Sequence, residues 1–161
     1  MKMKKFDISQ SLNKWDIRYL RMAETAAGWS KDGTKVGCCI VRPDKTLASI
    51  GFNGLPPGMP DDIYLQDRAF KNRIVIHAEE NAILSCRDAS MEGYTMYLWG
   101  LSPCGNCASK IARKGIKRVV YWVAYGMENN AWTDSCEAAK IVFNECGIEM
   151  EEANRSDFNA Q

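Results

Sequence analysis

The stretch 94–125, YTMYLWGLSPCGNCASKIARKGIKRVVYWVAY, contains two apolar strand patterns separated by a short helical pattern. The runs YTMYLWG and KRVVYWVAY are rich in aromatic and branched residues, which predicts strands at 94–100 and 117–125. Between them, CASKIARKG predicts a helix at 107–115 that ends at Gly115. Because a strand–helix–strand unit normally makes a right-handed crossover, the two strands should lie parallel in one sheet.

The same alternation continues on both sides of this stretch. Downstream, TDSCEAAKIVFNECG predicts a helix at 133–147, with Thr133 or Asp134 as its cap and Gly147 as its end, before a short strand at 148–152. Upstream, the chain predicts an amphipathic helix, a β-hairpin and a second helix. The amphipathic helix is expected at 13–28, the two hairpin strands at 35–43 and 46–54, and the second helix at 77–86. The intervening segment should be a loop at 55–62, rich in Pro and Gly, followed by one or two helical turns at 63–73.

This order of elements predicts an α/β protein with three layers, α/β/α. Its core would be a mixed five-stranded sheet flanked by helices, since the hairpin adds antiparallel strands to a largely parallel sheet. No repeat or linker divides the 161 residues, which favours one domain over 1–161. The polar tail from about residue 153 is expected to fray.

The composition excludes several classes of function. Hydrophobic residues make up 46% and charged residues 25%, and 21 basic against 20 acidic side chains give a net charge of +1. Proteins that track nucleic-acid phosphates need an excess of lysine and arginine. The chain has no apolar run of membrane-spanning length, and its basic MKMKK start leads into a polar stretch. We therefore expect a cytoplasmic protein that binds neither nucleic acid nor membranes.

One histidine and a cysteine pair supply the chemistry. His77 is the only histidine, and Cys104 and Cys107 follow in a Pro-Cys-x-x-Cys motif. A catalytic zinc ion takes three protein ligands and leaves its fourth position for water. Residues i and i+3 at the start of a helix share one face, so both thiolates can reach one ion. Glu79 follows the histidine by two residues, where its carboxylate can move protons without binding the metal.

Simpler interpretations exist for each part of this pattern. A Cys-x-x-Cys pair alone can be a redox centre, and a lone histidine is most often a surface or satisfied core residue. The combination of H-x-E with P-C-x-x-C is the signature of zinc nucleobase deaminases. We therefore predict a zinc-dependent deaminase.

Nearly the whole chain resembles one family, the deoxycytidylate (dCMP) deaminases of the cytidine deaminase-like superfamily. GFNG after the second strand and Asn81 within HAEENAI resemble the dCMP branch. The related tRNA adenosine deaminases usually have HAEI and a methionine between the cysteines, and both are absent here. The segments that carry the resemblance are WDIRYLRMAETAAGWSKDGTKVGCCIV (15–41), GFNG (51–54), HAEENAI (77–83), SPCGNCASKIARKGIKRVVYW (102–122) and SCEAAKIVFNECGI (135–148).

The resemblance implies an activity and a set of site residues. The activity is hydrolysis of dCMP to dUMP and ammonia, which supplies dUMP for dTMP synthesis, with dCTP as a further substrate to be tested. Zinc would be bound by His77, Cys104 and Cys107, and Glu79 would carry the protons. The nucleotide would contact Asn53 through its sugar, the backbone of Ala78 and Ser102 through its base, and Ser30, Lys31 or Thr34 through its phosphate.

The family also implies partners. The expected ligands are one catalytic Zn²⁺ ion and the allosteric effectors dCTP and dTTP, with Mg²⁺ bound only together with a nucleotide effector. The expected assembly is a homo-oligomer built from dimers, with a hexamer as one form. The long segment 55–73 is a candidate for regulation or subunit contact, with a packed surface excursion as the equal alternative. Two other functions stay open: deamination of a different cytosine or adenine substrate, such as a free nucleoside or nucleic acid, and a non-catalytic zinc or redox module.

Two further groups of residues are expected to serve packing. Some family members carry a second, structural zinc site with extra histidines, which this chain lacks. We therefore expect the remaining cysteines to be small buried hydrophobes, with the adjacent Cys38 and Cys39 on opposite faces of a strand. These cysteines are Cys38, Cys39, Cys86, Cys136 and Cys146. The aromatic residues Trp122, Tyr125 and Trp132 are predicted to cluster in the core or at a subunit interface rather than to stack on a base.

Overall fold

One mixed sheet of five strands lies at the centre of the computed structural model, which describes residues 12–125 and 130–159. Its strands are β1 (Gly37–Val41), β2 (Leu47–Phe52), β3 (Thr95–Gly100), β4 (Arg118–Val123) and β5 (Glu149–Glu152). They are arranged in the order β2-β1-β3-β4-β5. β1 pairs antiparallel with β2 and β3, and the remaining two pairs are parallel. The mixed sheet predicted from the sequence is confirmed.

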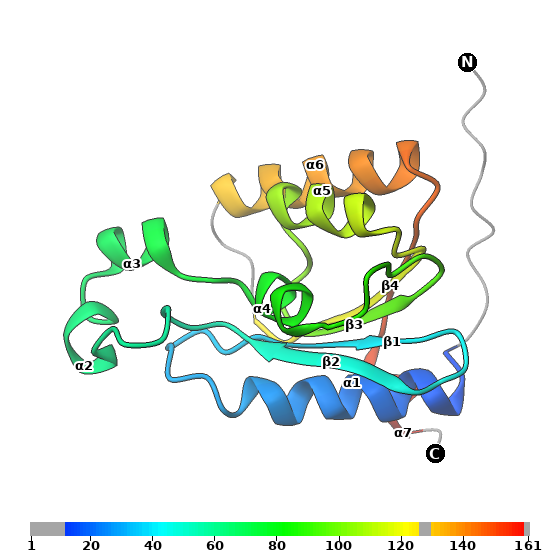
Figure 1. Cartoon of the computed structure of the whole chain (residues 1–161), viewed down its shortest axis with the longest axis horizontal. Helices are drawn as coiled ribbons and strands as arrows, with labels where there is room; N and C mark the ends of the chain where they lie inside the picture. The colour runs from blue at the N-terminus through cyan, green and yellow to red at the C-terminus, as the bar shows by residue number, and fades with distance from the viewer. Residues whose placement is uncertain (1–11, 126–129, 160–161) are drawn as a thin grey trace.

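Helices cover both faces of this sheet, which confirms the three-layer α/β/α class (Figure 1). One face packs against α1 (Lys14–Ala27). The other is covered by α4 (Ala78–Ser85), α5 (Gly105–Lys114) and α6 (Asn130–Glu145). Two short helices, α2 (Asp61–Tyr64) and α3 (Arg68–Ile74), stand to one side of the layers (Figure 1).

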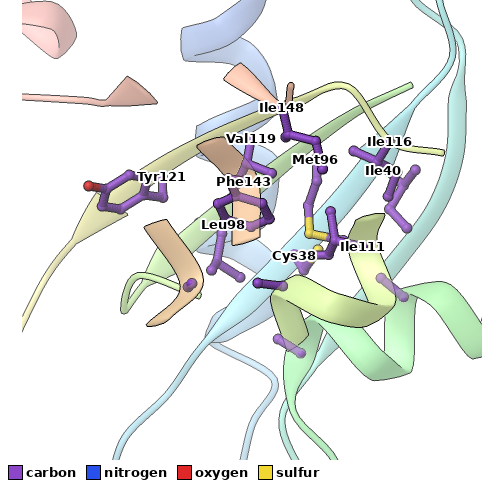
Figure 2. Packing of buried hydrophobic residues seen from close by; sticks show 14 of the residues in the cluster. Cys38, Ile40, Met96, Leu98, Ile111, Ile116, Val119, Tyr121, Phe143 and Ile148 are labelled. Carbon is purple, nitrogen blue, oxygen red and sulfur yellow. The ribbon is translucent and has the colours of Figure 1, made fainter. Parts of the chain in front are cut away.

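Strand alternation divides the interior into two apolar clusters, one on each face of the sheet. Cys38, Met96 and Leu98 point toward α4, α5 and α6, where they pack with Ile111 and Phe143 (Figure 2). Cys39, Tyr97 and Val120 belong to the opposite cluster and pack against α1. The predicted separation of Cys38 and Cys39 onto opposite faces is therefore confirmed.

Two glycines let helices approach the sheet backbone closely. A Cβ atom on Gly37 would lie 1.9 Å from the carbonyl oxygen of Ala23 in α1. A Cβ atom on Gly51 would lie 2.5 Å from the backbone nitrogen of Ala82 in α4. No side chain fits at either place, so these glycines set the depth at which α1 and α4 rest on β1 and β2.

The prediction of a fraying tail is wrong for most of its length. Ala153 is 3% exposed, and α7 (Arg155–Asn159) packs Phe158 edge-on against Trp122, with 5.0 Å between ring centroids. This contact is long-range, so the polar composition of the segment gave no sign of it. An aromatic side chain that buries itself against another removes apolar area from water and can order an otherwise polar terminus.

Two local predictions also need correction. The helix expected at 133–147 begins at Asn130, ahead of both predicted caps, Thr133 and Asp134. The loop expected at 55–62 ends early, because α2 begins at Asp61. The helical turns predicted within 63–73 are present as parts of α2 and α3.

The cysteines outside the predicted metal site are not all buried. Cys38, Cys39 and Cys136 are buried as expected, and Cys86 is half-buried against the core. Cys146 is exposed, so the prediction is wrong for that residue. It lies just beyond the last turn of α6, which ends at Glu145. Among the described residues, no helix is both long and apolar enough to cross a membrane.

Candidate active site

The N-terminus of α4 positions His77. The residue is the N-cap of this helix, with an extended backbone at φ −68° and ψ 157°. Its carbonyl oxygen accepts a hydrogen bond from the backbone of Asn81 at 2.9 Å, and its own N–H donates to Glu80 Oε2 at 3.2 Å. Because α4 rests directly on Gly51, the height of the imidazole above the sheet is fixed by this close packing.

The N-terminus of α5 positions the two cysteines. Cys104 is the N-cap, and its sulfur accepts a hydrogen bond from the backbone N–H of Cys107 at 3.4 Å. Pro103 precedes the cap and directs the chain from β3 into the helix. The spacing of three residues places both sulfurs on the same side of the first helical turn.

These two helix starts bring three metal-ligating atoms together. His77 Nδ1 lies 3.6 Å from Cys104 Sγ and 3.3 Å from Cys107 Sγ, and the three atoms all lie within 4.8 Å of one another. Typical Zn–N and Zn–S bond lengths of ~2.0 and ~2.3 Å give a nitrogen–sulfur separation of about 3.5 Å at a tetrahedral centre. One imidazole and two sulfurs at these distances fit a zinc ion.

The electrostatics of the cluster favour metal binding. Hydrogen bonding from the Cys107 thiol, together with the nearby imidazole, lowers the pKa of Cys104 to about 4 despite its burial. The lowered pKa of Cys104 favours the thiolate, the form that ligates metals. The pKa of Cys107 is raised by the hydrogen bond to Cys104 and by burial. Metal binding would displace a proton from a cysteine that is still protonated.

An ion pair joins the two helices that carry the ligands. Lys110 of α5 donates to the Glu80 carboxylate of α4. The other carboxylate oxygen of Glu80 accepts from the backbone N–H of His77. Glu80 thereby links the histidine to α5 from outside the ligand cluster.

His77 of the metal-ligating cluster lines a cavity of about 850 Å³. His77, Ala78 and Glu79 line it from α4, and Ser102 lines it from the end of β3. Glu79 is 3% exposed, and burial raises the pKa of its carboxyl to about 7. A buried carboxyl beside a potential metal site can exchange protons with a ligand in the cavity.

Asn53 lines the cavity but is also held in a structural network. Its side-chain Oδ1 accepts from the backbone N–H of Val36 at 2.9 Å, and its Nδ2 donates to the carbonyl oxygen of Thr34 at 2.8 Å. Thr34 lines the cavity as well. The amide keeps one N–H and a lone pair for a ligand.

Ser30 and Lys31 do not line this cavity. The Ser30 hydroxyl is buried and donates to the carbonyl oxygen of Asn53 at 2.8 Å. The Lys31 side chain is 73% exposed and forms an ion pair with Asp61 at 2.8 Å. Lys31 and Asp61 line a separate, smaller cavity.

Sequence reasoning missed several polar residues of the cavity wall. Asp32 and the α3 residues Arg68, Lys71 and Asn72 line it. A signal for the basic pair was available, because Arg68 and Lys71 are three residues apart and therefore share a helix face. Nothing in the sequence indicated that this face turns toward the cavity.

The three aromatic residues grouped by sequence do not form one cluster. Trp122 contacts Phe158, Tyr125 packs edge-on against Trp99, and Trp132 lies 6.2 Å from His77 between ring centroids. Tyr125 and Trp132 line the cavity and belong to neither apolar cluster, whereas a position at a subunit interface stays a prediction. Trp122 belongs to β4 and Trp132 to α6, so the two rings lie on different elements of the fold.

The chain matches a known family model. Residues 13–123 match the model described as cytidine and deoxycytidylate deaminase zinc-binding region. This span includes the histidine, both cysteines and Glu79.

Curated relatives match over most of the chain. An uncharacterized deaminase in the luxG 3′ region of Aliivibrio fischeri is 34% identical over 140 residues, which cover 86% of this chain and 93% of that protein. The deoxycytidylate deaminase of Homo sapiens is 33% identical over 142 residues, covering 84% of this chain and 77% of that protein.

A solved structure has the same fold. A crystal structure of dCMP deaminase from the cyanophage S-TIM5, in complex with dCMP and dUMP, superimposes with a TM-score of 0.65 at 27% identity. The match covers 84% of this chain and 94% of that one.

Proposed function

The chain belongs to the cytidine and deoxycytidylate deaminase family, and on that premise we propose that it hydrolyses dCMP to dUMP and ammonia. The observation that carries this proposal is the position of Glu79, buried in the wall of the same cavity that His77 of the metal-ligating cluster lines. A closed structural metal site would use a fourth protein ligand and would have no need of an acid beside it.

His77, Cys104 and Cys107 would hold one zinc ion. When bound, zinc supplies the Lewis acidity that makes water nucleophilic near neutral pH. The chain then has to bind the nucleotide, orient the pyrimidine with its C4 atom toward this cluster, and move protons. The cavity is large enough for a nucleotide, since small-molecule sites measure ~300–1,000 Å³.

Glu79 would carry out the proton transfers. In the net reaction a C4–O bond forms, the C4–N bond breaks, and water supplies the oxygen. The carboxylate takes a proton from the attacking water and delivers one to N3 of the cytosine ring. A second transfer, to the amino nitrogen, lets ammonia leave and uracil remain.

The walls beside Glu79 suit a pyrimidine nucleoside. The backbone of Ala78 and Ser102 can read the base edge, because both residues line the cavity next to the cluster. Trp132 presents an aromatic ring beside His77, against which a planar base can pack. Asn53 has hydrogen-bonding capacity left for the sugar.

The substrate assay separates this function from the two alternatives. Purified, zinc-loaded protein would be incubated with dCMP, deoxycytidine, dCTP and a cytosine-containing oligonucleotide, and ammonia release would be followed. We expect dCMP to be the preferred substrate. Turnover of the oligonucleotide alone would assign the protein to nucleic-acid deamination, and zinc binding without any turnover would indicate a non-catalytic module.

Assembly, regulation and location remain part of the proposal. We propose a homo-oligomer of dimers, sensitive to dCTP and dTTP, in the cytoplasm. Sedimentation of the protein with and without each nucleotide tests the first two points. The expected Mg²⁺ has no support in the structure. Among the described residues, His77, Cys104 and Cys107 are the only group of three or more His, Cys, Asp or Glu side chains placed so that they could hold a metal ion.

A further inference from the structure

The cavity-facing side of α3 is polar and cationic. Arg68, Lys71, Asn72 and Val75 all line the cavity, and they follow the spacing i, i+3, i+4 and i+7. The helix buries no residue completely. A helix that faces the interior of a protein normally presents an apolar stripe. Two cations and an amide at these positions favour contact with an anion instead.

Lys71 is held in place by a buried carboxylate. Its ammonium donates to Asp32 at 2.9 Å, and the two side chains are only 14% and 6% exposed. The backbone N–H of Thr34 also donates to Asp32, at 3.1 Å, which fixes the carboxylate. An ammonium carries three N–H bonds, so Lys71 can bind a second acceptor while it keeps Asp32.

Arg68 adds a second cation with no competing carboxylate. It lies one turn before Lys71 on the same face of α3, and it forms no ion pair with any residue in 12–125 or 130–159. The neighbouring Arg73 carries the same charge but does not line the cavity. The orientation of the helix therefore selects which basic side chains line the cavity.

We infer that Arg68 and Lys71 form the subsite for the 5′-phosphate of the substrate, with Asp32 as the positioning residue that orients Lys71. This inference rests on the proposed function, which places the base beside His77 and Glu79 in the same cavity. The sugar then extends the ligand toward α3, the outlying helix that precedes α4 (Figure 1). Lys31, the basic candidate from the sequence, is exposed and bound to Asp61 outside the cavity.

The test compares binding of a nucleotide with binding of its nucleoside. Zinc-loaded full-length protein would be titrated calorimetrically with dUMP and with deoxyuridine, which differ only by the phosphate and need no turnover. Arg68→Met and Lys71→Met should each weaken dUMP binding roughly 10- to 100-fold, because each removes a charged hydrogen bond. Both variants should change deoxyuridine binding by less than about twofold.

Two further variants control for folding and charge. Arg73→Met removes the same charge from the same helix and should leave both affinities unchanged. Lys71→Arg keeps the cation beside Asp32 and should retain most of the dUMP affinity. If Lys71→Met unfolds because it leaves Asp32 unpaired, Arg68→Met decides the question, since it leaves no buried charge alone.

Several results would overturn the subsite. Among them are unchanged dUMP binding in both α3 variants, equal losses for dUMP and deoxyuridine, and a loss in Lys31→Met alone. Failure of the proposed function looks different, because the wild type would then turn over no cytosine nucleotide. A wild type that deaminates dCMP while the α3 variants match it would leave the function intact and remove only this subsite.

Discussion

His77 Nδ1 lies 3.3 Å from Cys107 Sγ, although 30 residues separate them in the chain. The two atoms meet because α4 and α5 begin at the same end of the sheet. One helix follows the excursion through α2 and α3, and the other follows β3. The position of each helix start, rather than any direct link between the segments, therefore creates the metal site.

Removing the imidazole should abolish metal binding. His77→Ala leaves two sulfurs, and we expect stoichiometric zinc to be lost in elemental analysis of the purified protein. Cys146→Ala is the matched control, because this exposed cysteine lies outside the cluster and should leave the zinc content unchanged. Full zinc occupancy in His77→Ala would show that another residue completes the site.

Removing the acid should separate chemistry from metal binding. Glu79→Gln keeps the size of the side chain but cannot shuttle protons, so kcat should fall by ~10²–10⁴-fold while the zinc content stays at one per chain. Glu137→Gln, on the exposed surface of α6, should behave like the wild type in both assays. Near-normal turnover in Glu79→Gln would exclude this carboxylate as the proton carrier.

The contact between Gly51 and α4 predicts a steric effect on the site. A methyl group at Gly51 would meet Ala82 N at 2.5 Å and Ala78 O at 2.7 Å, so α4 must move away from β2. We expect Gly51→Ala to lower the free energy of unfolding by ~1–3 kcal/mol in urea titration and to weaken zinc binding. Gly54→Ala has open space around its Cβ position and should show neither effect.

The two tryptophans should separate base binding from folding. Trp132→Ala should raise KM for dCMP and for deoxycytidine alike, by about tenfold or more, because it removes a stacking surface that does not involve the phosphate. Trp122→Ala should lower the unfolding temperature and leave KM unchanged, since its ring packs against Phe158. Equal KM values in the wild type and Trp132→Ala would remove Trp132 from the base site.

A buried ion pair predicts how stability depends on pH. Asp16 in α1 accepts hydrogen bonds from Arg118 in β4 at 2.7 and 3.1 Å and from the Tyr97 hydroxyl at 2.8 Å. Burial works to raise the pKa of Asp16, but these hydrogen bonds outweigh it, and the pKa lies below its ordinary value. The unfolded carboxyl titrates near pH ~3.9.

A lowered folded pKa means that the stabilisation from Asp16 is complete above pH ~4 and is lost as the pH falls further through the folded value. We therefore expect the urea midpoint of the wild type to drop steeply below pH ~4. Asp16→Asn should be less stable at pH 7 and should show a shallower drop in that acid range. Parallel acid curves for the two proteins would mean that other carboxyls control the transition.

Much of the site could be predicted because its information is local. The H-x-E and P-C-x-x-C spacings fix side chains on single helical turns, and the periodicities of 94–125 fix the strand–helix–strand order. Both depend on backbone geometry over a few residues. The candidate metal-ligating residues, the neighbouring carboxyl and the sheet class follow from these short segments without knowledge of the whole fold.

What lies across the cavity from the ligands could not be predicted in this way. Lys31 and Lys71 are both basic residues in polar segments, yet Lys31 points to solvent and Lys71 is buried against Asp32. Likewise, Trp122 and Trp132 are close in sequence but face Phe158 and His77.

The sequence alone determined the candidate metal-ligating residues His77, Cys104 and Cys107, the neighbouring carboxyl of Glu79 and the α/β order of the chain. The tertiary structure alone decided which charges and rings surround the substrate cavity. The physical reason is that backbone hydrogen bonding encodes periodicity over one or two turns. The environment of a side chain depends instead on how helices, strands and loops from distant parts of the chain pack together.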